Sequence, residues 1–252
     1  MAPATLDDVR TGSKAVPWTE FNCDPTRSIL VDTSADAWLE SGASGVSRKM
    51  IERLGGEVAR CSTVVRFLPN KSFPEHEHGG GEEFLVLDGV WKDGFGTFPK
   101  YSYIRNYIGS RHTPAIPAGG CTILVKLRQM AREEPEPPHV SWDCSPEAPG
   151  WKRFADGRQR MYVYASRFER VTVERWPPGA AVDSEVPHGG REVFVVDGSF
   201  SDALGEHKAW SWSRYASDGE TTKAQAGPEG CYLYVKEGHR GSPEVGAGPR
   251  PE

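Results

Sequence analysis

The chain has 252 residues, of which 37% are hydrophobic and 26% are charged, and its formal net charge is -5 at pH 7. This length allows one large domain or two smaller ones with buried cores. The acidic balance, without a Lys/Arg-rich stripe, argues against nucleic acid as a partner. No stretch approaches the roughly 20 apolar residues of a membrane span, and the first 16 residues lack the apolar core of a signal peptide. We therefore expect a cytoplasmic protein with a small-molecule substrate or ligand as partner, and we leave a homodimer open.

The five cysteines are widely spaced, and none forms a Cys-x-x-Cys pair. An odd number with this spacing fits reduced thiols better than a disulfide framework. We expect Cys61, Cys121 and Cys231 to be small buried residues that pack within strands.

In chain order, the sequence predicts short strands joined by turns, a pattern that its 28 glycines and 20 prolines favour. Residues 1–16 and 241–252 are expected to be flexible ends, and residues 45–54 fit either a short helix or a strand. The charged, proline-rich run 128–138 is expected to be a linker, with a domain boundary near residue 135. Strands are predicted at 58–68, 72–77, 82–88, 100–106, 121–128, 160–175, 191–197, 208–214 and 231–236.

A nine-residue pattern occurs twice in the chain. Residues 88–96 and residues 197–205, which lie 109 positions later, both read Asp-Gly-x-aromatic-x-Asp-x-x-Gly. The repeat predicts two tandem domains, one spanning 17–134 and the other 135–240. In each domain the strands would close around a central pocket as a double-stranded jelly roll, so we predict an all-β protein.

The first domain contains a candidate metal site. His76 and His78 are one residue apart, so on a strand both imidazoles lie on one face and can reach one ion. The glycines at 79–81 allow a tight turn that returns the chain and brings Glu82 to the same point. His112 would supply a further ligand from a more distant strand. Taken alone, the His-x-His pair also fits a solvated polar turn.

These donors do not identify the ion. Three imidazoles and one carboxylate suit Fe(II), Zn(II), Mn(II), Ni(II) or Cu(II), and we expect one divalent transition metal, Fe(II) or Zn(II) first. With four protein ligands a tetrahedral zinc site would be closed and structural, whereas an octahedral Fe(II) or Mn(II) would keep two positions for substrate and dioxygen.

The second domain lacks this set of donors. At an offset of 109 residues the four ligand positions become Glu185, Pro187, Arg191 and Thr221. We therefore expect a barrel without metal that serves for stability or pairing. In a second interpretation, Arg191 and Glu185 form an ion pair in the vacated space.

The motif around His76 resembles the first motif of the cupin superfamily, a glycine-bounded His-x-His followed by a glutamate and, six residues later, by Gly89. The text that continues to residue 114, GGGEEFLVLDG, then Asp-x-x-Gly, then GSRHTP, resembles the ChrR-like branch of that superfamily. The resemblance covers residues 45–130 well and 150–240 more faintly. It implies two tandem cupin barrels, a bicupin, with metal ligands His76, His78, Glu82 and His112.

The resemblance also implies an activity, since the ChrR-like branch includes enzymes that cleave β-diketones and hydroxyacetophenones with dioxygen. A non-haem Fe(II) dioxygenase acting on a small carbonyl compound is therefore the first hypothesis, with Glu82 as a ligand or, if displaced, a catalytic base. Tyr101, Tyr103 and Arg105 share one strand parity and would bind an anionic substrate. The same parity also fits a barrel exterior with aromatic packing.

Two other functions stay open. A zinc-binding sensor or ligand-binding module is one, because the anti-sigma factors of this branch carry a zinc-loaded cupin. Their N-terminal zinc domain cannot form here, since the first 45 residues contain no histidine and only Cys23. An isomerase of a small keto acid or sugar is the other, supported by the breadth of the superfamily alone.

Overall fold

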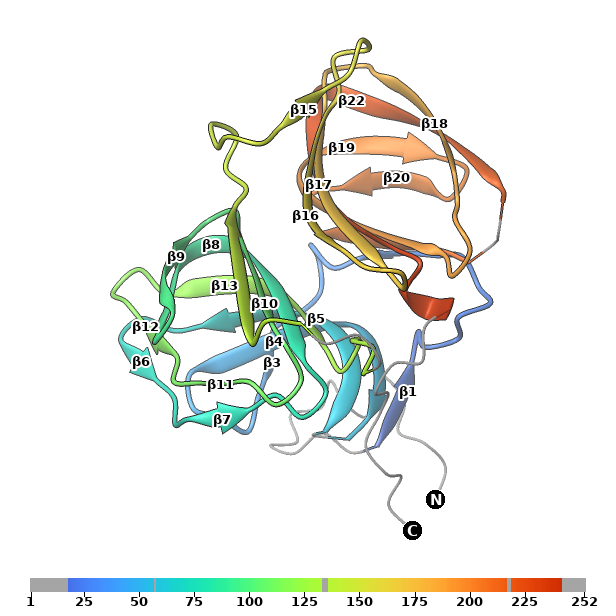
Figure 1. Cartoon of the computed structure of the whole chain (residues 1–252). Helices are drawn as coiled ribbons and strands as arrows, with labels where there is room; N and C mark the ends of the chain where they lie inside the picture. Colours follow the sequence, from blue (N-terminus) through green and yellow to red (C-terminus); the bar gives the residue numbers. More distant parts are fainter. Residues whose placement is uncertain (1–17, 57, 133–135, 217–218, 242–252) are drawn as a thin grey trace. The chain divides into compact units, whose positions relative to one another are not determined.

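A computed structural model describes residues 18–56, 58–132, 136–216 and 219–241. Within them the chain forms twenty-two strands and one short 3-10 helix, which confirms the predicted all-β class. The expected flexible ends lie outside the described residues, apart from Gly241. The chain divides into two compact units, each with strands that curve into a barrel (Figure 1).

The first unit contains the described residues 18–23 and 37–145. Its main sheet is antiparallel, with the order β1-β4-β5-β13-β8-β10-β14, while β7 pairs with β11 apart from it. The ambiguous run 45–54 is a strand. The strands are β1 (Thr19–Phe21), β3 (Leu39–Glu40), β4 (Val46–Gly55), β5 (Ala59–Phe67), β6 (Lys71–Ser72), β7 (His76–Glu77), β8 (Glu82–Asp93), β9 (Gly96–Pro99), β10 (Ser102–Asn106), β11 (Arg111–His112), β12 (Ala115–Ile116), β13 (Cys121–Leu127) and β14 (His139–Asp143).

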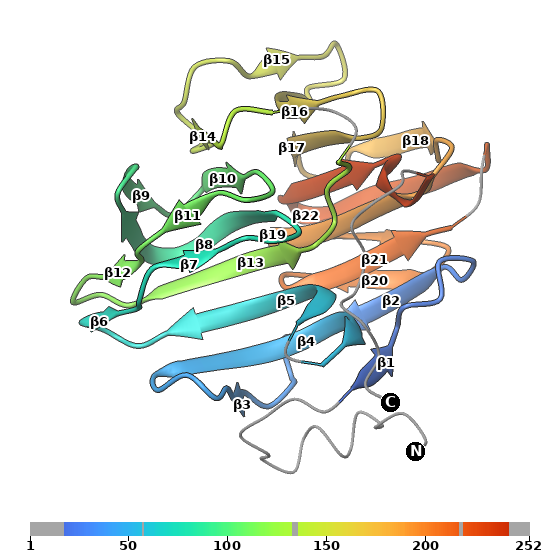
Figure 2. The same ribbon diagram turned by 60° about the horizontal axis from the view of Figure 1, so that its bottom comes forward.

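The second unit contains the described residues 24–36, 146–216 and 219–241. Its sheet has the order β15-β16-β17-β22-β19-β21-β2, with β18 on β22 and β20 on β19 (Figure 2). Its elements are β2 (Ile29–Asp32), β15 (Lys152–Arg153), β16 (Gln159–Ala165), β17 (Arg170–Trp176), β18 (Ala181–Glu185), β19 (Arg191–Asp202), β20 (Gly205–Lys208), β21 (Ser211–Tyr215), β22 (Thr221–Glu237) and the 3-10 helix η1 (His239–Gly241).

The two units repeat one another at the offset read from the sequence. Strands β8, β9 and β10 begin and end 109 residues before β19, β20 and β21. Gly89 and Gly198, the glycines of the repeated pattern, have φ angles of 71° and 76°. A Cβ at either position would overlap with the carbonyl oxygen of Gly120 or Gly230, so both the backbone conformation and the close approach require glycine.

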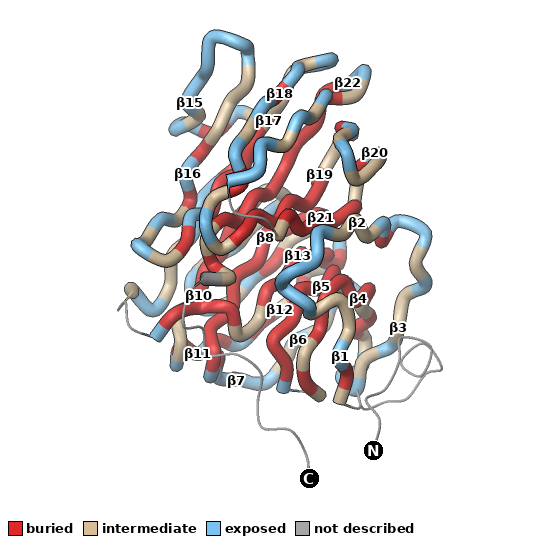
Figure 3. Tube along the Cα trace, turned by 90° about the vertical axis from the view of Figure 1, so that its right-hand side faces the viewer, coloured by how far each residue is buried: buried red, intermediate tan, exposed pale blue. Residues whose placement is uncertain are grey.

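Alternation along the strands builds the core of each unit. In the first unit Phe84 and Val86 of β8 share a buried cluster with Ile104 of β10 and with Ile123 and Val125 of β13. These residues are two apart on each strand, as expected for side chains on one face of a sheet. Burial is concentrated along the strands, and much of the exposed chain lies in the connections (Figure 3).

The division between the units differs from the predicted boundary near residue 135. Strand β14, expected in the second domain, pairs with β10 of the first unit, and β2, expected in the first domain, pairs with β21 of the second. The reason is physical: β10 and β21 would otherwise leave a row of N–H and C=O groups unpaired at a sheet edge. In the division by contacts, the charged, proline-rich run therefore lies within the first unit.

The cysteines are placed as the sequence predicted. Cys61, Cys121, Cys144 and Cys231 are buried, while Cys23 is partly exposed. Burial raises the pKa of Cys121, Cys144 and Cys231 to about 12, so these thiols stay protonated near neutral pH.

We expect this burial to protect the thiols from alkylation. Native protein treated with iodoacetamide at pH 8 should be modified fast at Cys23 alone, because the reagent attacks thiolates that solvent can reach. Peptide mass spectrometry after timed quenching measures each site, with urea-unfolded protein as the control in which all five react. Rapid native modification of Cys121 or Cys231 would contradict the packing described.

Candidate metal centre

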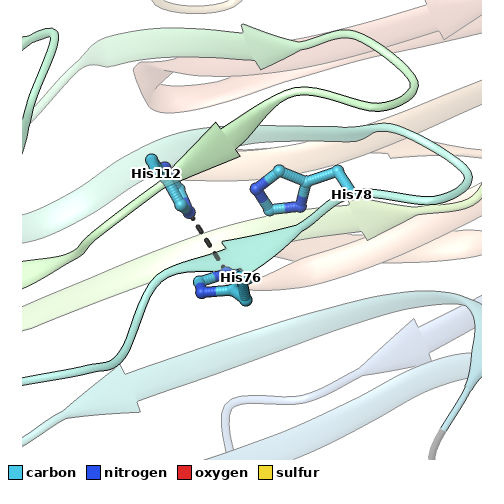
Figure 4. Close-up of side chains that lie close together, drawn as sticks. All are labelled: His76, His78 and His112. Carbon is cyan, nitrogen blue, oxygen red and sulfur yellow. Dashed lines mark hydrogen bonds between the residues drawn. The ribbon is translucent and has the colours of Figure 1, made fainter.

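Three histidines converge at one end of the first barrel. His76 lies on β7, His78 follows it, and His112 on β11 is paired directly opposite His76. Their ring centroids are 4.6, 4.7 and 5.0 Å apart, and one nitrogen of each lies within 4.8 Å of the others (Figure 4). The structure thus brings together all three histidines predicted as ligands.

The hydrogen bonds of two of the rings leave a lone pair on the nitrogen that faces the other histidines. His76 Nδ1 lies 3.1 Å from the Pro74 carbonyl oxygen, and His112 Nδ1 lies 3.1 Å from Asp93 Oδ2. Because only an N–H can donate to these oxygens, both rings are left with a lone pair on Nε2. These two Nε2 atoms are 3.2 Å apart, and the buried Nε2 of His78 has no hydrogen-bond partner. Such an arrangement of acceptors fits a cation.

Glu82 lies beside the histidines, as predicted. Its Oε2 is 3.5 Å from His78 Nε2 and 3.8 Å from His112 Nε2. The same oxygen accepts a hydrogen bond of 3.0 Å from Asn106 Nδ2. Among the described residues, the group whose donor atoms all lie within 4.8 Å of one another contains the three imidazoles and does not include Glu82. Glu82 as a fourth ligand therefore stays a prediction.

The electrostatics suit a metal ion. Burial lowers the pKa of His78, which keeps its ring neutral, the form that coordinates a metal. Burial alone would raise the pKa of Asp93, but hydrogen bonds from His112, Trp91 and the Phe95 backbone outweigh it and lower that pKa. An anionic Asp93 therefore stands behind His112 and strengthens its remaining nitrogen as a donor to the metal.

Three residues of the site were missed by sequence reasoning. Asp93 belongs to the repeated pattern, and that position could have indicated a role. Asn106 also lies on β10, but its side chain points to the face opposite to that of Tyr103 and Arg105, the residues predicted to bind substrate. His139, whose Nδ1 donates to Asn106 Oδ1 at 2.9 Å, lies on β14 beyond the expected boundary, so no sequence signal connected it to the first domain.

The residues predicted to bind substrate are not brought to the histidines. Tyr103 donates its hydroxyl to Glu83 at 2.7 Å, and Arg105 donates to Glu83 at 3.1 Å and to Glu136 at 2.6 and 2.8 Å. These side chains are buried on the face of the sheet opposite to Glu82, since neighbouring residues of a strand alternate. They match the alternative of packing on the barrel exterior.

Tyr101 also lies outside the cluster. It occupies the turn before β10 with a φ of 70°, and its backbone N–H donates to the Val86 carbonyl at 2.8 Å. The ammonium group of Lys100 lies 4.6 Å from the centre of its ring. The structure thus gives Tyr101 a conformational role in a turn.

Among its described residues, the second unit holds no equivalent cluster. Within the described part of the chain, His76, His78 and His112 are the only group of this kind. The expected ion pair between Arg191 and the Glu185 carboxylate does not form: Arg191 Nε donates to Glu237 Oε1 at 2.8 Å, and it contacts Glu185 only at the backbone carbonyl. The reason is that Glu237, on the strand beside Arg191, presents its carboxylate to the interior.

Two jelly-roll barrels, one with histidines converging at its end, define a two-domain protein of the cupin superfamily. A family model for the ChrR cupin-like domain matches residues 26–131 and 143–240. The chain therefore belongs to the ChrR cupin-like family. Among the described residues, the structure contains no helix with the length and apolar character needed to cross a membrane.

Solved structures with a similar fold serve different purposes. The fold is similar to a bacterial pirin in complex with nickel(II) from Escherichia coli, with 11% identity, coverage of 88% of this chain and 100% of that one, and a TM-score of 0.62. Quercetin 2,3-dioxygenase from Acinetobacter baumannii is 12% identical, with coverage of 83% of this chain and 78% of that one and a TM-score of 0.57. An 11S globulin from Wrightia tinctoria with an auxin binding site is 10% identical, with coverage of 89% of this chain and 85% of that one and a TM-score of 0.60. A search of the curated proteins found no match.

We expect His112→Ala to lower the metal content of the purified protein, because alanine offers no lone pair in place of Nε2. The affinity for the metal should fall by about 100-fold or more, while most of the barrel's stability, which comes from apolar burial, is retained. Thr221→Ala, at the matching position of the second domain, is the control and should leave one metal per chain. Elemental analysis with thermal melting measures both; undiminished metal in His112→Ala would remove this residue from the site.

A second prediction concerns Asp93, which holds His112. Asp93→Asn removes the negative charge behind the imidazole and should weaken metal binding by about 10- to 100-fold. Asp88→Asn, at an exposed position of the same strand, should change nothing. Competition with a chelator of known affinity measures both variants, and equal affinities would contradict the role given to Asp93.

Proposed function

We propose that the first domain is the catalytic domain of a non-haem Fe(II) dioxygenase that acts on a small carbonyl compound of the β-diketone or aryl ketone class. The observation that supports it best is the convergence of three imidazole nitrogens at a site with one open side. His78 and His112 are buried, whereas His76 is exposed, so a small molecule can approach the point where the nitrogens meet. A purely structural zinc site has no need for such an approach.

In this proposal His76, His78 and His112 would hold the ion. When bound, it would supply Lewis-acid and dioxygen chemistry. Glu82, held by Asn106, would be a fourth ligand or would accept the proton that a carbonyl compound loses from its acidic carbon. Asp93 keeps the proton of His112 on Nδ1 and thereby keeps Nε2 available.

The surroundings favour an apolar, flat substrate. Trp91 lies beneath His112, with 5.6 Å between the ring centres, and packs against Phe84 at 4.9 Å. Phe95 stacks on His139 at 4.1 Å with parallel rings and is 45% exposed. The exposed ring of Phe95 can stack on an aryl ring, while Trp91 and Phe84 belong to the apolar core behind the histidines. A quercetin dioxygenase among the solved structures with this fold supports the same reaction class.

A zinc-binding module without catalysis is the second candidate. Glu82 Oε2 lies within 4 Å of His78 and His112, and four protein donors would close a tetrahedral zinc site. The 11S globulin, a protein of similar fold, has an auxin binding site.

Oxygen uptake after metal loading separates the two candidates. Protein stripped with a chelator and reloaded anaerobically with Fe(II) should consume dioxygen when acetylacetone or 2′-hydroxyacetophenone is added. His76→Ala, loaded in the same way, should show no uptake, and Thr221→Ala should match the unaltered protein.

Metal analysis of protein purified without added ions completes this test. One tightly bound zinc per chain, with no oxygen uptake from either substrate class after Fe(II) loading, would contradict the dioxygenase and favour the binding module. Uptake that persists in His76→Ala would mean that the reaction occurs elsewhere.

A further inference from the structure

The second domain contains an internal cavity that the metal centre does not use. Its volume is about 40 Å³, whereas one water needs about 10–15 Å³ measured in this way. It therefore has room for about three waters or a molecule of similar size. Part of its wall is apolar, formed by residues that include Val193, Phe200 and Leu233.

The cavity exists because the second domain has smaller core side chains than the first. At the 109-residue offset, Phe84 becomes Val193 and Trp91 becomes Phe200, and both replacements lose ring volume in the barrel interior. The rings of Phe84 and Trp91 pack on one another in the first domain. Their loss leaves space between strands whose backbones are unchanged in register.

Charged side chains also replace apolar ones around this space. Glu174 lies on β17 at the position of Val65, and Glu237 lies on β22 at the position of Leu127, as the strand registers show. Glu174 accepts a hydrogen bond of 2.7 Å from Arg160. Burying ion pairs seldom adds stability over apolar residues of similar volume. Replacing apolar side chains by ion pairs therefore gives no advantage to a barrel that serves only for packing.

The polar groups around the cavity offer donors rather than acceptors. Both oxygens of Glu174 already accept, one from Arg160 and the other from Trp176 at 2.9 Å. Both oxygens of Glu237 accept as well, one from Arg191 and the other from Arg170. Asp202, the third carboxylate of the lining, accepts from His207 on one oxygen and from Tyr215 on the other. The carboxylates that line the cavity thus have few free positions for a guest.

Arg158 and Arg160 have more N–H donors than their described hydrogen bonds use. A guanidinium carries five N–H donors. Among the described residues, Arg160 uses Nε for Glu174 and contacts the Tyr162 hydroxyl, and Arg158 uses Nε for Asp156. Both side chains are about one quarter exposed, at 22% for Arg158 and 24% for Arg160, so they mark the end of the cavity that solvent reaches.

We infer that this cavity binds a small carboxylate of two or three carbons. Its oxygens would accept from the free N–H groups of Arg158 and Arg160, a pairing for which the guanidinium is well suited. Its carbon end would lie against Val193, Phe200 and Leu233. The site is independent of the metal centre and of the function proposed for it.

The full-length protein should therefore bind acetate and propionate, measured by ligand-observed NMR at constant ionic strength. Acetamide, which has the shape of acetate without its charge, should not bind. Arg160→Gln should weaken acetate binding by about tenfold or more, as expected for the loss of a charged hydrogen bond. Val193→Phe, which restores the ring of the first domain and leaves every charge in place, should abolish it.

Arg153→Gln, at an exposed position of β15, is the matched control and should bind acetate normally, as should His76→Ala. Thermal melting checks that each variant is folded. Hexanoate, too long for the cavity, should not displace acetate, and this comparison requires no variant. Absence of saturable acetate and propionate binding, equal affinity in folded Val193→Phe, or displacement by hexanoate would overturn the inference.

Discussion

The antiparallel pairing of β7 with β11 is the constraint on which the candidate metal centre depends. It places His112 directly opposite His76, and a slip of one residue would turn the His112 ring to the other face. Asp93, at the end of β8, then holds the ring through Nδ1. Position, orientation and protonation of the ring are therefore set by three separate elements, so the site is preorganised before any ion arrives.

The two domains show that one backbone fold can hold two different sets of interior side chains. In the second, Glu185 is paired opposite Thr221 just as His76 is opposite His112, yet neither offers an imidazole. Arg191, at the position of Glu82, reverses the charge at the same point of the barrel. The shared core and the repeated glycines maintain the fold, while a few inward positions decide what each interior can bind.

Local patterns predicted much of this architecture, because strand alternation, turn glycines and a repeat are properties of neighbouring residues. The three histidines and the adjacent Glu82 followed from spacing of that kind. For Tyr103 and Arg105 the sequence left two interpretations, because a parity shared along β10 cannot say which face is the interior. In the structure these side chains bond to Glu83 and Glu136. His139 could not be predicted as part of the site, since its partner Asn106 is 33 residues away on a strand of the other predicted domain.

Strand β2 is synthesised long before the strand with which it pairs. Strand β2 leaves the ribosome early, but Ile29 pairs with Arg214 of β21, which emerges much later. Closing a loop of that length is entropically costly and slow compared with local pairing. The first barrel can complete its own sheet with β14 while β2 still waits for its partner. The apolar residues of β2 thus stay unpaired until β21 has been synthesised, and an unpaired apolar segment is prone to aggregation during that interval.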